Sequence, residues 1–525
     1  MRFWIILNIA FQIFCSKTMF TSITTTLLLI TTLLSTAAAG AHGVLEEKTQ
    51  LSGGLCDASV TQHSGYYKLN TPGSTNKNYF YWMFESRVAP KDAPFILWMT
   101  GGPGCSGMLA LLNENGPCTI ERGVSGLEEK NNTQSWTNAA NVLWIDQPAG
   151  VGFSYGDSGD YDHDEKGVRD DMYYFMTEFM TAHPEYASNE FYVFGESYGG
   201  HYAPNVAYRI WEGNNKEAEA NGFPHINLKG LAVGNGLTDP SIQYKWYAKM
   251  ANNNTYGVKS VPDNQYVAMI SEQAECVGLI EKCQNDTSAC AIAQSTCNQA
   301  QIGPYEESGL NPYDVREKCK VKPLCYDFTA PTDWLNLPAT RKALGITSSS
   351  SQWSSCNMQV NQQFKNDWMK TQQYTIPPLL ADGIRVLIYA GDADFICNWM
   401  GNKAWTLALD WNGNAAFNGA LDHDWSVNGK KAGTARHASN FTFLQVNNAG
   451  HMVPMNQPEN SLSMIETFMS GHVLEQSFEY FSFMHLTHWQ REFNVSQFCL
   501  VILAITTFPQ SPDDSVAHVL VDLSQ

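Results

Sequence analysis

The amino-acid sequence predicts an α/β fold in which a mostly parallel central sheet carries helices on both faces. Short apolar runs are followed by turn residues rich in Gly, Asp and Pro, and helical stretches come after the turns. This alternation is typical of strands joined by crossover helices. In such sheets the functional residues follow the carboxyl ends of the strands. The apolar runs are 95–98, 141–145, 191–194, 228–233, 385–389 and 441–446.

Composition and charge limit the classes of partner. The chain has 525 residues, of which 44% are hydrophobic and 12% aromatic, so we expect a sizeable buried core. The formal net charge is −19, without a run of Lys or Arg. This balance argues against a nucleic-acid surface and against binding to acidic membranes.

Residues 1–41 are expected to be a signal-peptide region. An apolar segment precedes small residues that suit cleavage after Ala39 or Ala41. We expect translation to start at Met19, so that residues 1–18 result from a wrongly chosen start site, because a start at Met19 leaves a signal peptide of ordinary length. Neither apolar run reaches the ~20 unbroken residues of a membrane span. We expect no stable span and a protein of the secretory pathway, either lysosomal or vacuolar, or secreted.

The pattern of strands changes in the middle of the chain and again near its end. We expect a core formed by 42–236 and 379–472, interrupted by an inserted helical, disulfide-rich cap at 237–378. The tail at 473–525 departs in composition, and its apolar run at 498–505 is too short to span a bilayer.

Cysteine usage supports an oxidising compartment, because thirteen cysteines are unusual for a cytosolic protein. Cys276, Cys283, Cys290 and Cys297 recur every seven residues, so on a helical hairpin they share one face. A hairpin favours nested pairs, with Cys283–Cys290 inside Cys276–Cys297. A zinc site is disfavoured because no CxxC motif occurs. Sequons typical of a secreted glycoprotein stand at Asn131, Asn253, Asn285, Asn440 and Asn494.

The motif Gly195-Glu-Ser197-Tyr-Gly199 follows the apolar run at 191–194 and precedes a helical stretch at 202–211. A sharp strand-to-helix turn needs small neighbours and exposes the serine hydroxyl at the start of the helix. The motif therefore predicts that Ser197 is the nucleophile of a serine hydrolase.

The expected base is His451, which follows the run at 441–446. His201 is its rival, but four residues after Ser197 it should point away from the hydroxyl and pack within the helix. Asp392 and Asp394 both follow the strand at 385–389, and the pattern does not separate them as the orienting acid. Either gives the order Ser…Asp…His, which is the order of the α/β-hydrolase fold.

The oxyanion hole is expected from the N–H of Tyr198 and from an N–H of the Gly101–Gly104 loop.

Longer motifs make the sequence similar to the serine carboxypeptidases of the carboxypeptidase Y, cathepsin A and plant type. The resemblance covers roughly residues 50–472. The matching segments keep the order of the family, and they are W98-MTGGPGCS, W144-IDQPAGVGFSY, G195-ESYGGHYAP, G234-NGLTDP, Y389-AGDADFICNW and A449-GHMVP.

This resemblance implies the roles of five residues. Ser197 becomes the nucleophile, His451 the general base and Asp394, rather than Asp392, the orienting acid. The oxyanion donors become the backbone of Gly102 and Tyr198.

The family also binds the free C-terminal carboxylate of its substrate, which implies a site at Trp98, Gly101, Glu114 and Glu196. Two carboxylates bind a third only if one of them is protonated, so the resemblance implies peptidase activity favoured by acid. The family's usual Asn in this segment is Thr100 here, and a hydroxyl has a shorter reach than an amide.

The resemblance further implies that Cys397 is a free cysteine near the substrate pocket, so thiol reagents are expected to inhibit. Met452, with the surroundings of Leu109 and Asn113, is expected to shape the pocket for the C-terminal side chain. The disulfides implied in addition are Cys105–Cys356, Cys319–Cys325 and Cys56–Cys118.

Three other classes of protein compete with this interpretation. A metallo-carboxypeptidase lacks support because HExxH is absent, and the HxxE match at His472–Glu475 lies at the start of the atypical tail. A lipase or acyltransferase of the same fold has no need for the glutamate pair. A non-enzymatic protective protein would lack a triad member, and all three are present. No metal and no cofactor are expected, and the partners are peptides or proteins with a free C-terminus.

Overall fold

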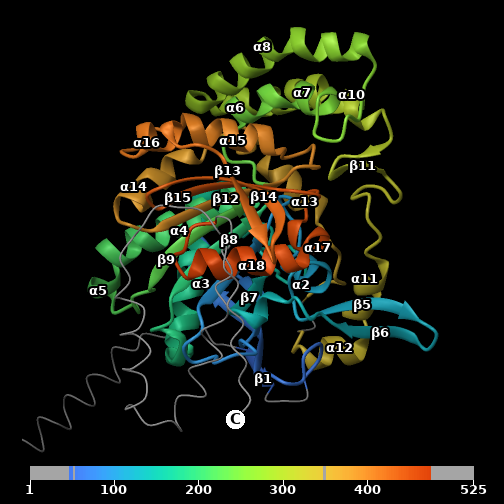
Figure 1. Ribbon diagram of the computed structural model, residues 1–525. Coiled ribbons are helices and arrows are strands. Elements are labelled where there is room, and N and C mark those ends of the chain that lie inside the picture. The colour runs from blue at the N-terminus through green and yellow to red at the C-terminus, as the bar shows by residue number, and fades with distance from the viewer. Residues whose placement is uncertain (1–45, 51–53, 347–349, 475–525) are drawn as a thin grey trace, which may run out of the picture. The chain divides into compact units, whose positions relative to one another are not determined.

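The computed structural model describes residues 46–50, 54–346 and 350–474, of which 46–50 are described by their backbone alone. An eleven-stranded sheet crosses the molecule in the order β1-β2-β3-β7-β4-β8-β9-β12-β15-β14-β13 (Figure 1). Its strands are β1 (Glu46–Gln50), β2 (Gln62–Leu69), β3 (Lys77–Phe84), β4 (Phe95–Thr100), β7 (Asn141–Ile145), β8 (Phe191–Glu196), β9 (Leu228–Gly234), β12 (Arg385–Gly391), β13 (His423–Val427), β14 (Lys430–Ala438) and β15 (Phe441–Val446).

The centre of this sheet is parallel and its flanks are antiparallel. The six runs predicted from the sequence are the six parallel strands β7, β4, β8, β9, β12 and β15. The flanking strands β1–β3 and β13–β14 were not predicted, and they pair antiparallel. The registers Trp98↔Trp144 and Trp98↔Phe194 bring the carboxyl ends of the central strands to one edge of the sheet.

Helices cover both faces of the sheet, which confirms the predicted α/β fold. Side chains alternate along the strands, so one face packs on α3, α4 and α15 and the other on α2 and α18. The helices that accompany the sheet are α2 (Gly107–Asn113), α3 (Glu165–Ala182), α4 (Gly199–Lys216), α5 (Ala218–Asn221), α15 (Trp399–Ala408), α16 (Asn414–Gly419), α17 (Val453–Asn456) and α18 (Pro458–Met469).

Between β9 and β12 the chain adds no strand to the large sheet among the residues described. It forms helices and the short pair β10 (Leu310–Asn311) and β11 (Asp314–Lys318). Division of the chain into a core and a cap at 237–378 stays a prediction. The helices are α6 (Pro240–Gln243), α7 (Tyr247–Asn252), α8 (Asp263–Asn285), α9 (Cys290–Cys297), α10 (Gly303–Glu306), α11 (Thr329–Leu335), α12 (Pro338–Ala343), α13 (Met358–Gln363) and α14 (Ile376–Ala381).

Five disulfides link the described part of the chain. α8 and α9 form a hairpin in which Cys283–Cys290 lies inside Cys276–Cys297, the nesting expected from the seven-residue spacing. The other three pairs are Cys56–Cys118, Cys105–Cys356 and Cys319–Cys325.

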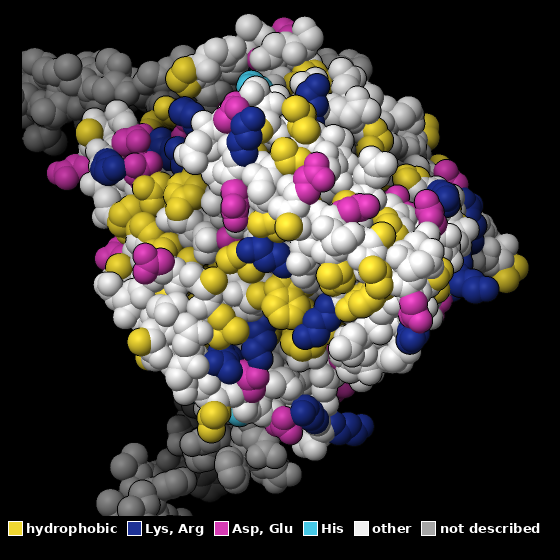
Figure 2. Space-filling view, turned by 90° about the horizontal axis from the view of Figure 1, so that it is seen from above, with side chains coloured by type: hydrophobic (Ala, Val, Ile, Leu, Met, Phe, Trp, Pro, Cys, Tyr) yellow, Lys and Arg dark blue, Asp and Glu magenta, His cyan; other side chains and the backbone are white. Residues whose placement is uncertain are grey.

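Several expectations lie outside the described residues: the signal-peptide region, the tail beyond residue 474 and the sequon at Asn494. Within the described ranges no helix has both the length and the hydrophobicity needed to cross a bilayer. On the face shown in Figure 2, hydrophobic, acidic and basic side chains lie intermixed, which agrees with the absence of Lys/Arg runs in the sequence.

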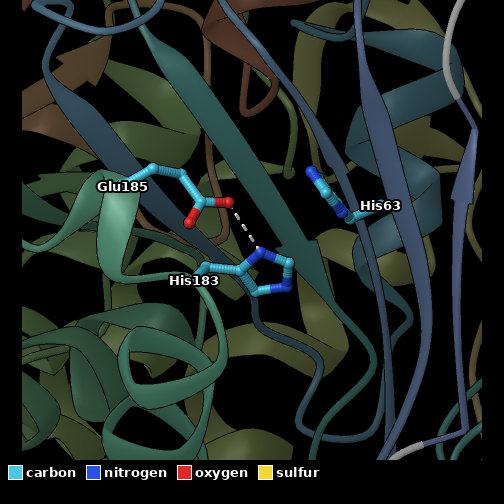
Figure 3. Close-up of side chains that lie close together, drawn as sticks. All are labelled: His63, His183 and Glu185. Atoms are coloured by element: carbon cyan, nitrogen blue, oxygen red, sulfur yellow. Dashed lines mark hydrogen bonds and ion pairs between the residues drawn. The ribbon is translucent and has the colours of Figure 1, made fainter.

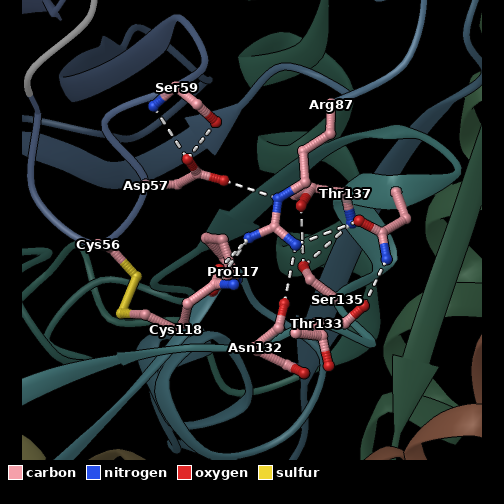
Figure 4. Close-up of polar contacts among 12 residues, drawn as sticks. Cys56, Asp57, Ser59, Arg87, Pro117, Cys118, Asn132, Thr133, Ser135 and Thr137 are labelled. Atoms are coloured by element: carbon pink, nitrogen blue, oxygen red, sulfur yellow. Dashed lines mark hydrogen bonds and ion pairs between the residues drawn. A yellow bond between two sulfur atoms is a disulfide. The ribbon is translucent and has the colours of Figure 1, made fainter.

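Arg87 fastens the segment around the Cys56–Cys118 disulfide to the body of the fold (Figure 4). Its Nε donates to Asp57 Oδ2 at 2.7 Å and its Nη1 donates to the carbonyl of Asn132 at 2.8 Å. Both partners of the ion pair are mostly shielded, since Arg87 is 17% and Asp57 8% exposed by side chain. A shielded pair with extra hydrogen bonds is costly to break, because the charge left behind stays desolvated.

We expect Arg87→Met to lower the free energy of unfolding by about 3 kcal/mol, because Asp57 and the backbone carbonyls lose their donor. Urea denaturation followed by tryptophan fluorescence measures this loss. Arg122→Met is the matched control, because Arg122 pairs with Asp333 while both side chains are more than half exposed. The control should lose less than about 1 kcal/mol. Equal losses in the two variants would contradict this assignment.

Candidate active site

Ser197 stands in the sharp turn between β8 and α4. Its φ of 64° lies in the left-handed region, which non-glycine residues adopt only at an energetic cost. The turn is possible because Gly195 lacks a Cβ, which would lie 2.6 Å from the carbonyl oxygen of Gly199. Ser197 is partly exposed although both neighbours are buried. The structure thus presents the hydroxyl at the carboxyl edge of the sheet.

His451 and Asp394 meet at the same edge. His451 Nδ1 lies 2.8 Å from Asp394 Oδ2, and both side chains are buried. Asp394 also accepts from the backbone N–H of Ile396 and of Cys397, each at 3.1 Å. Asp392 lies in another network, where its Oδ1 accepts from the Tyr256 hydroxyl at 2.5 Å. The structure therefore separates the two aspartates that the sequence pattern left tied.

Asn235, for which the sequence motifs predicted no role, links the serine turn to this pair. Its Nδ2 donates to Asp394 Oδ2 at 2.8 Å, and its Oδ1 accepts from Gly391 N at 3.0 Å. The preceding residue, Gly234, accepts from the backbone N–H of Ser197 at 3.2 Å. The position of Asn235 directly after β9 was the available signal, since side chains at strand ends gather at this edge.

The glycine loop after β4 packs directly against the serine turn. A Cβ on Gly101 would lie 2.3 Å from the backbone nitrogen of Tyr198. Gly102 has a φ of 110°, a conformation that favours glycine. No hydrogen bond among the described residues uses the amide hydrogens of Gly102 and Tyr198. Two amide donors therefore lie on adjacent turns beside Ser197.

Glu114 and Glu196 are buried together next to the nucleophile. Glu114 follows α2, Glu196 ends β8, and they are 5% and 4% exposed. Burial raises the pKa of Glu114 to about 7, and burial together with the charge of Glu114 raises the pKa of Glu196 well above its usual range. The Oε2 atom of each glutamate lacks a hydrogen-bond partner among the described residues. Such a pair retains a proton that it can donate to a ligand.

Thr100 and Trp98 lie on β4 next to this pair, with Thr100 opposite Glu196 in the strand register. Trp98 is fully buried and its indole N–H donates to Thr100 Oγ1 at 2.9 Å. The indole thus fixes the hydroxyl oxygen, and the hydroxyl hydrogen is left for another acceptor. Because Trp98 has no exposed surface, it acts on the site only by orienting the Thr100 hydroxyl.

His201, the rival histidine, lies in α4 as its position four residues after Ser197 predicts. It is fully buried, and its Nδ1 lies 2.5 Å from the carbonyl of Leu237. Burial lowers the pKa of His201 to about 4, so the ring is neutral. Its ring stacks on Tyr198, whose hydroxyl donates to Asp367 Oδ2 at 2.8 Å. This contact to Asp367 was not expected from the sequence.

Cys397 and Met452 flank the pair of His451 and Asp394 in sequence and in space. Cys397 is a free, buried thiol, and burial raises its pKa well above the usual range. Met452 and Leu109 are each 8% exposed. Asn113 Nδ2 donates to the carbonyl of Leu109, which fixes that side chain on α2.

Comparison with known proteins decides the family. Residues 54–471 match the family model described as serine carboxypeptidase. The chain belongs to the serine carboxypeptidase family. It is 42% identical over 450 residues to "Serine carboxypeptidase-like 49" of Arabidopsis thaliana, covering 84% of each chain. It is 44% identical over 427 residues to "Carboxypeptidase Y homolog A" of Arthroderma otae, covering 79% of this chain and 75% of the relative.

A solved structure agrees with this membership. The crystal structure of Kex1(Δ)p, a prohormone-processing carboxypeptidase of Saccharomyces cerevisiae, matches with a TM-score of 0.70 at 26% identity. The match covers 81% of this chain and 94% of that chain. The predicted resemblance and the predicted class of enzyme, a hydrolase of the serine carboxypeptidase family, are confirmed.

Proposed function

We propose that this serine carboxypeptidase removes the C-terminal residue of peptides through an acyl-enzyme formed on Ser197, and that it works best in acid. The observation that carries the proposal is the buried pair Glu114–Glu196 beside the strained serine turn. A lipase or esterase has no use for a site that binds a free carboxylate, whereas a carboxypeptidase requires one.

In the proposed chemistry His451 acts as general base and takes the proton of the Ser197 hydroxyl, which attacks the last peptide carbonyl. Asp394 accepts from His451 Nδ1, so Nε2 is left to face the hydroxyl. The amides of Gly102 and Tyr198 stabilise the oxyanion. His451 then protonates the leaving amine, and water cleaves the acyl-enzyme by the reverse transfers.

Recognition of the C-terminal carboxylate is assigned to Thr100, Gly101, Glu114 and Glu196, with Trp98 orienting the Thr100 hydroxyl. One protonated glutamate and the Thr100 hydroxyl each supply a donor, and the glycine brings the backbone close. Cys397, Met452 and the surface near Leu109 line the pocket for the leaving residue.

The glutamate pair predicts that kcat/KM falls as pH rises. The raised pKa values keep both glutamates protonated in acid. One proton is lost as pH rises through the pKa of Glu114, about 7, and the other only as pH rises through the pKa of Glu196, which burial and the charge of Glu114 raise well above its usual range. Each ionised glutamate adds negative charge that repels the substrate carboxylate, so kcat/KM should fall progressively as pH rises above about 7, mainly through KM. Glu114→Gln keeps an amide donor at every pH and should flatten the fall.

The control for this prediction is Glu121→Gln, on the exposed end of β5 (Cys118–Gly123). It should keep the wild-type profile. If kcat/KM of Glu114→Gln falls with rising pH as steeply as that of the wild type, the proposed role of the pair is wrong.

Release of the C-terminal residue from N-blocked dipeptides tests the proposed function as a whole. We expect release at pH ~5 that exceeds release at pH ~8. No release at pH ~5, together with hydrolysis of simple esters, would favour the lipase alternative instead.

We also propose that the protein travels the secretory pathway to a lysosome or vacuole, or to the outside of the cell. Five disulfides support an oxidising compartment. The sequons Asn131, Asn253 and Asn285 are exposed, so a glycan has room there. Asn440 is less suited, because its Nδ2 already donates to two backbone carbonyls, of Leu380 and Ile384.

A further inference from the structure

We propose that His63, His183 and Glu185 form a zinc site at the edge of the sheet opposite the active site. One side-chain ligand atom from each residue lies within 4.8 Å of those of the other two. The two histidines are buried and the glutamate is exposed. Figure 3 shows the Glu185 carboxylate and the His63 ring approaching the ring of His183 from two sides. The proposal is independent of the hydrolytic function.

The ligand chemistry and one distance fit zinc. Two imidazoles and a carboxylate are ligands that Zn²⁺ prefers, and a site with three protein ligands keeps a fourth position for water. Zinc bonds of ~2.0–2.1 Å in a tetrahedron hold two ligand atoms about 3.3 Å apart. His183 Nδ1 and Glu185 Oε1 are 3.1 Å apart, so the ion would replace the proton that now joins them. His63 then has to approach by a small side-chain movement.

The surroundings hold the two rings in place. The rings of His63 and His183 meet edge to face with centroids 4.4 Å apart, and the Phe179 ring lies 4.6 Å from that of His183. Side chains ordered before binding lose less entropy when the ion arrives. The Tyr186 hydroxyl lies 3.4 Å from His63 Nε2 and donates to Glu85 Oε1 at 3.0 Å. A second carboxylate close to the ligands adds negative charge that favours a cation.

The site joins segments that are distant in sequence. His63 lies on β2, where it pairs with Met83 of β3, and His183 follows α3 and precedes the 3₁₀ turn η2 (Pro184–Tyr186). The Tyr186 ring contacts Phe95, the first residue of β4. The cluster therefore lies at the amino ends of the parallel strands, whereas Ser197 follows a carboxyl end. Zinc there would tie an antiparallel flank of the sheet to the connection before β8.

The test uses the full chain. A chelator first removes bound metal, and Zn²⁺ alone is then added as the probe. We expect one tightly held zinc per chain after dialysis, measured by plasma emission, and a melting temperature that rises with added Zn²⁺. Glu185→Gln changes an exposed side chain, so it should fold normally and weaken zinc binding by roughly 10- to 100-fold. His63→Gln should abolish the tight site, while His225→Gln, at an exposed histidine, should keep it.

Two results would overturn the proposal. One is the absence of a tightly bound zinc in the wild-type chain. The other is zinc that survives in both Glu185→Gln and His63→Gln but is lost in His451→Gln, which would locate the ion in the active site.

Discussion

Ser197→Ala should lower kcat on N-blocked dipeptides by roughly 10⁶-fold, with little change in KM. The hydroxyl is the only group that this substitution removes, and we expect the proposed amide donors and glutamate pair to bind the substrate as before. Residual hydrolysis then depends on water and the oxyanion donors alone. Steady-state release of the C-terminal amino acid at acid pH, over a range of enzyme concentrations, measures the loss.

Ser271→Ala is the matched control, because Ser271 lies on the exposed face of α8 and far from the serine turn in sequence. It should keep full activity. Both variants should also keep the wild-type melting temperature to within a few degrees. Activity of Ser197→Ala above a hundredth of the wild type would assign the nucleophile to another residue.

Asp394→Asn should lower kcat by about 10⁴-fold without unfolding the protein. Three donors point at Asp394 Oδ2, from His451, Asn235 and the Cys397 backbone, and one more points at Oδ1 from Ile396. An amide in either orientation turns its own N–H₂ toward a donor. Where the amide nitrogen faces His451, the imidazole loses its acceptor and adopts the wrong tautomer. Where the amide oxygen faces His451, the imidazolium formed in the reaction loses the neighbouring negative charge that stabilises it.

Asp392→Asn separates this role from the general cost of removing a buried aspartate nearby. Its Oδ1 accepts from the Tyr256 hydroxyl and from Asn448 N, and an amide oxygen can accept both bonds. We expect less than a tenfold loss of kcat, measured in the same release assay. Comparable losses in the two aspartate variants would refute the assignment of Asp394.

The central strands were predictable because both faces of each are covered, so they appear in the sequence as continuous apolar runs. The flanks were not, because residues such as Lys77 and His63 interrupt them. Lys77 is buried yet charged, and its Nζ donates to Asp162 at 2.9 Å, a partner that is 85 positions away in sequence. A pairing at that separation leaves no local pattern.

The candidate site shows the same division. The serine turn was predictable from local motif, because a tight backbone turn fixes its residue types. Burial of Glu114 was not, since a position at the end of α2 fits an exposed helix end equally well. The choice between Asp392 and Asp394 depended on resemblance, because the two side chains differ only in which neighbours the tertiary fold brings to them. The link through Asn235 and the hydrogen bond from Trp98 to Thr100 are set by the tertiary fold and leave no local pattern in the sequence.

We propose that this chain recognises a free C-terminal carboxylate and cleaves the bond before it. The most direct measurement compares kcat/KM for one N-blocked dipeptide as its free acid and as its C-terminal amide, at pH ~5. We expect the free acid to be preferred by at least about 100-fold, because the contacts proposed for the glutamate pair and Thr100 are made to the free carboxylate. Equal rates on the acid and the amide would contradict it.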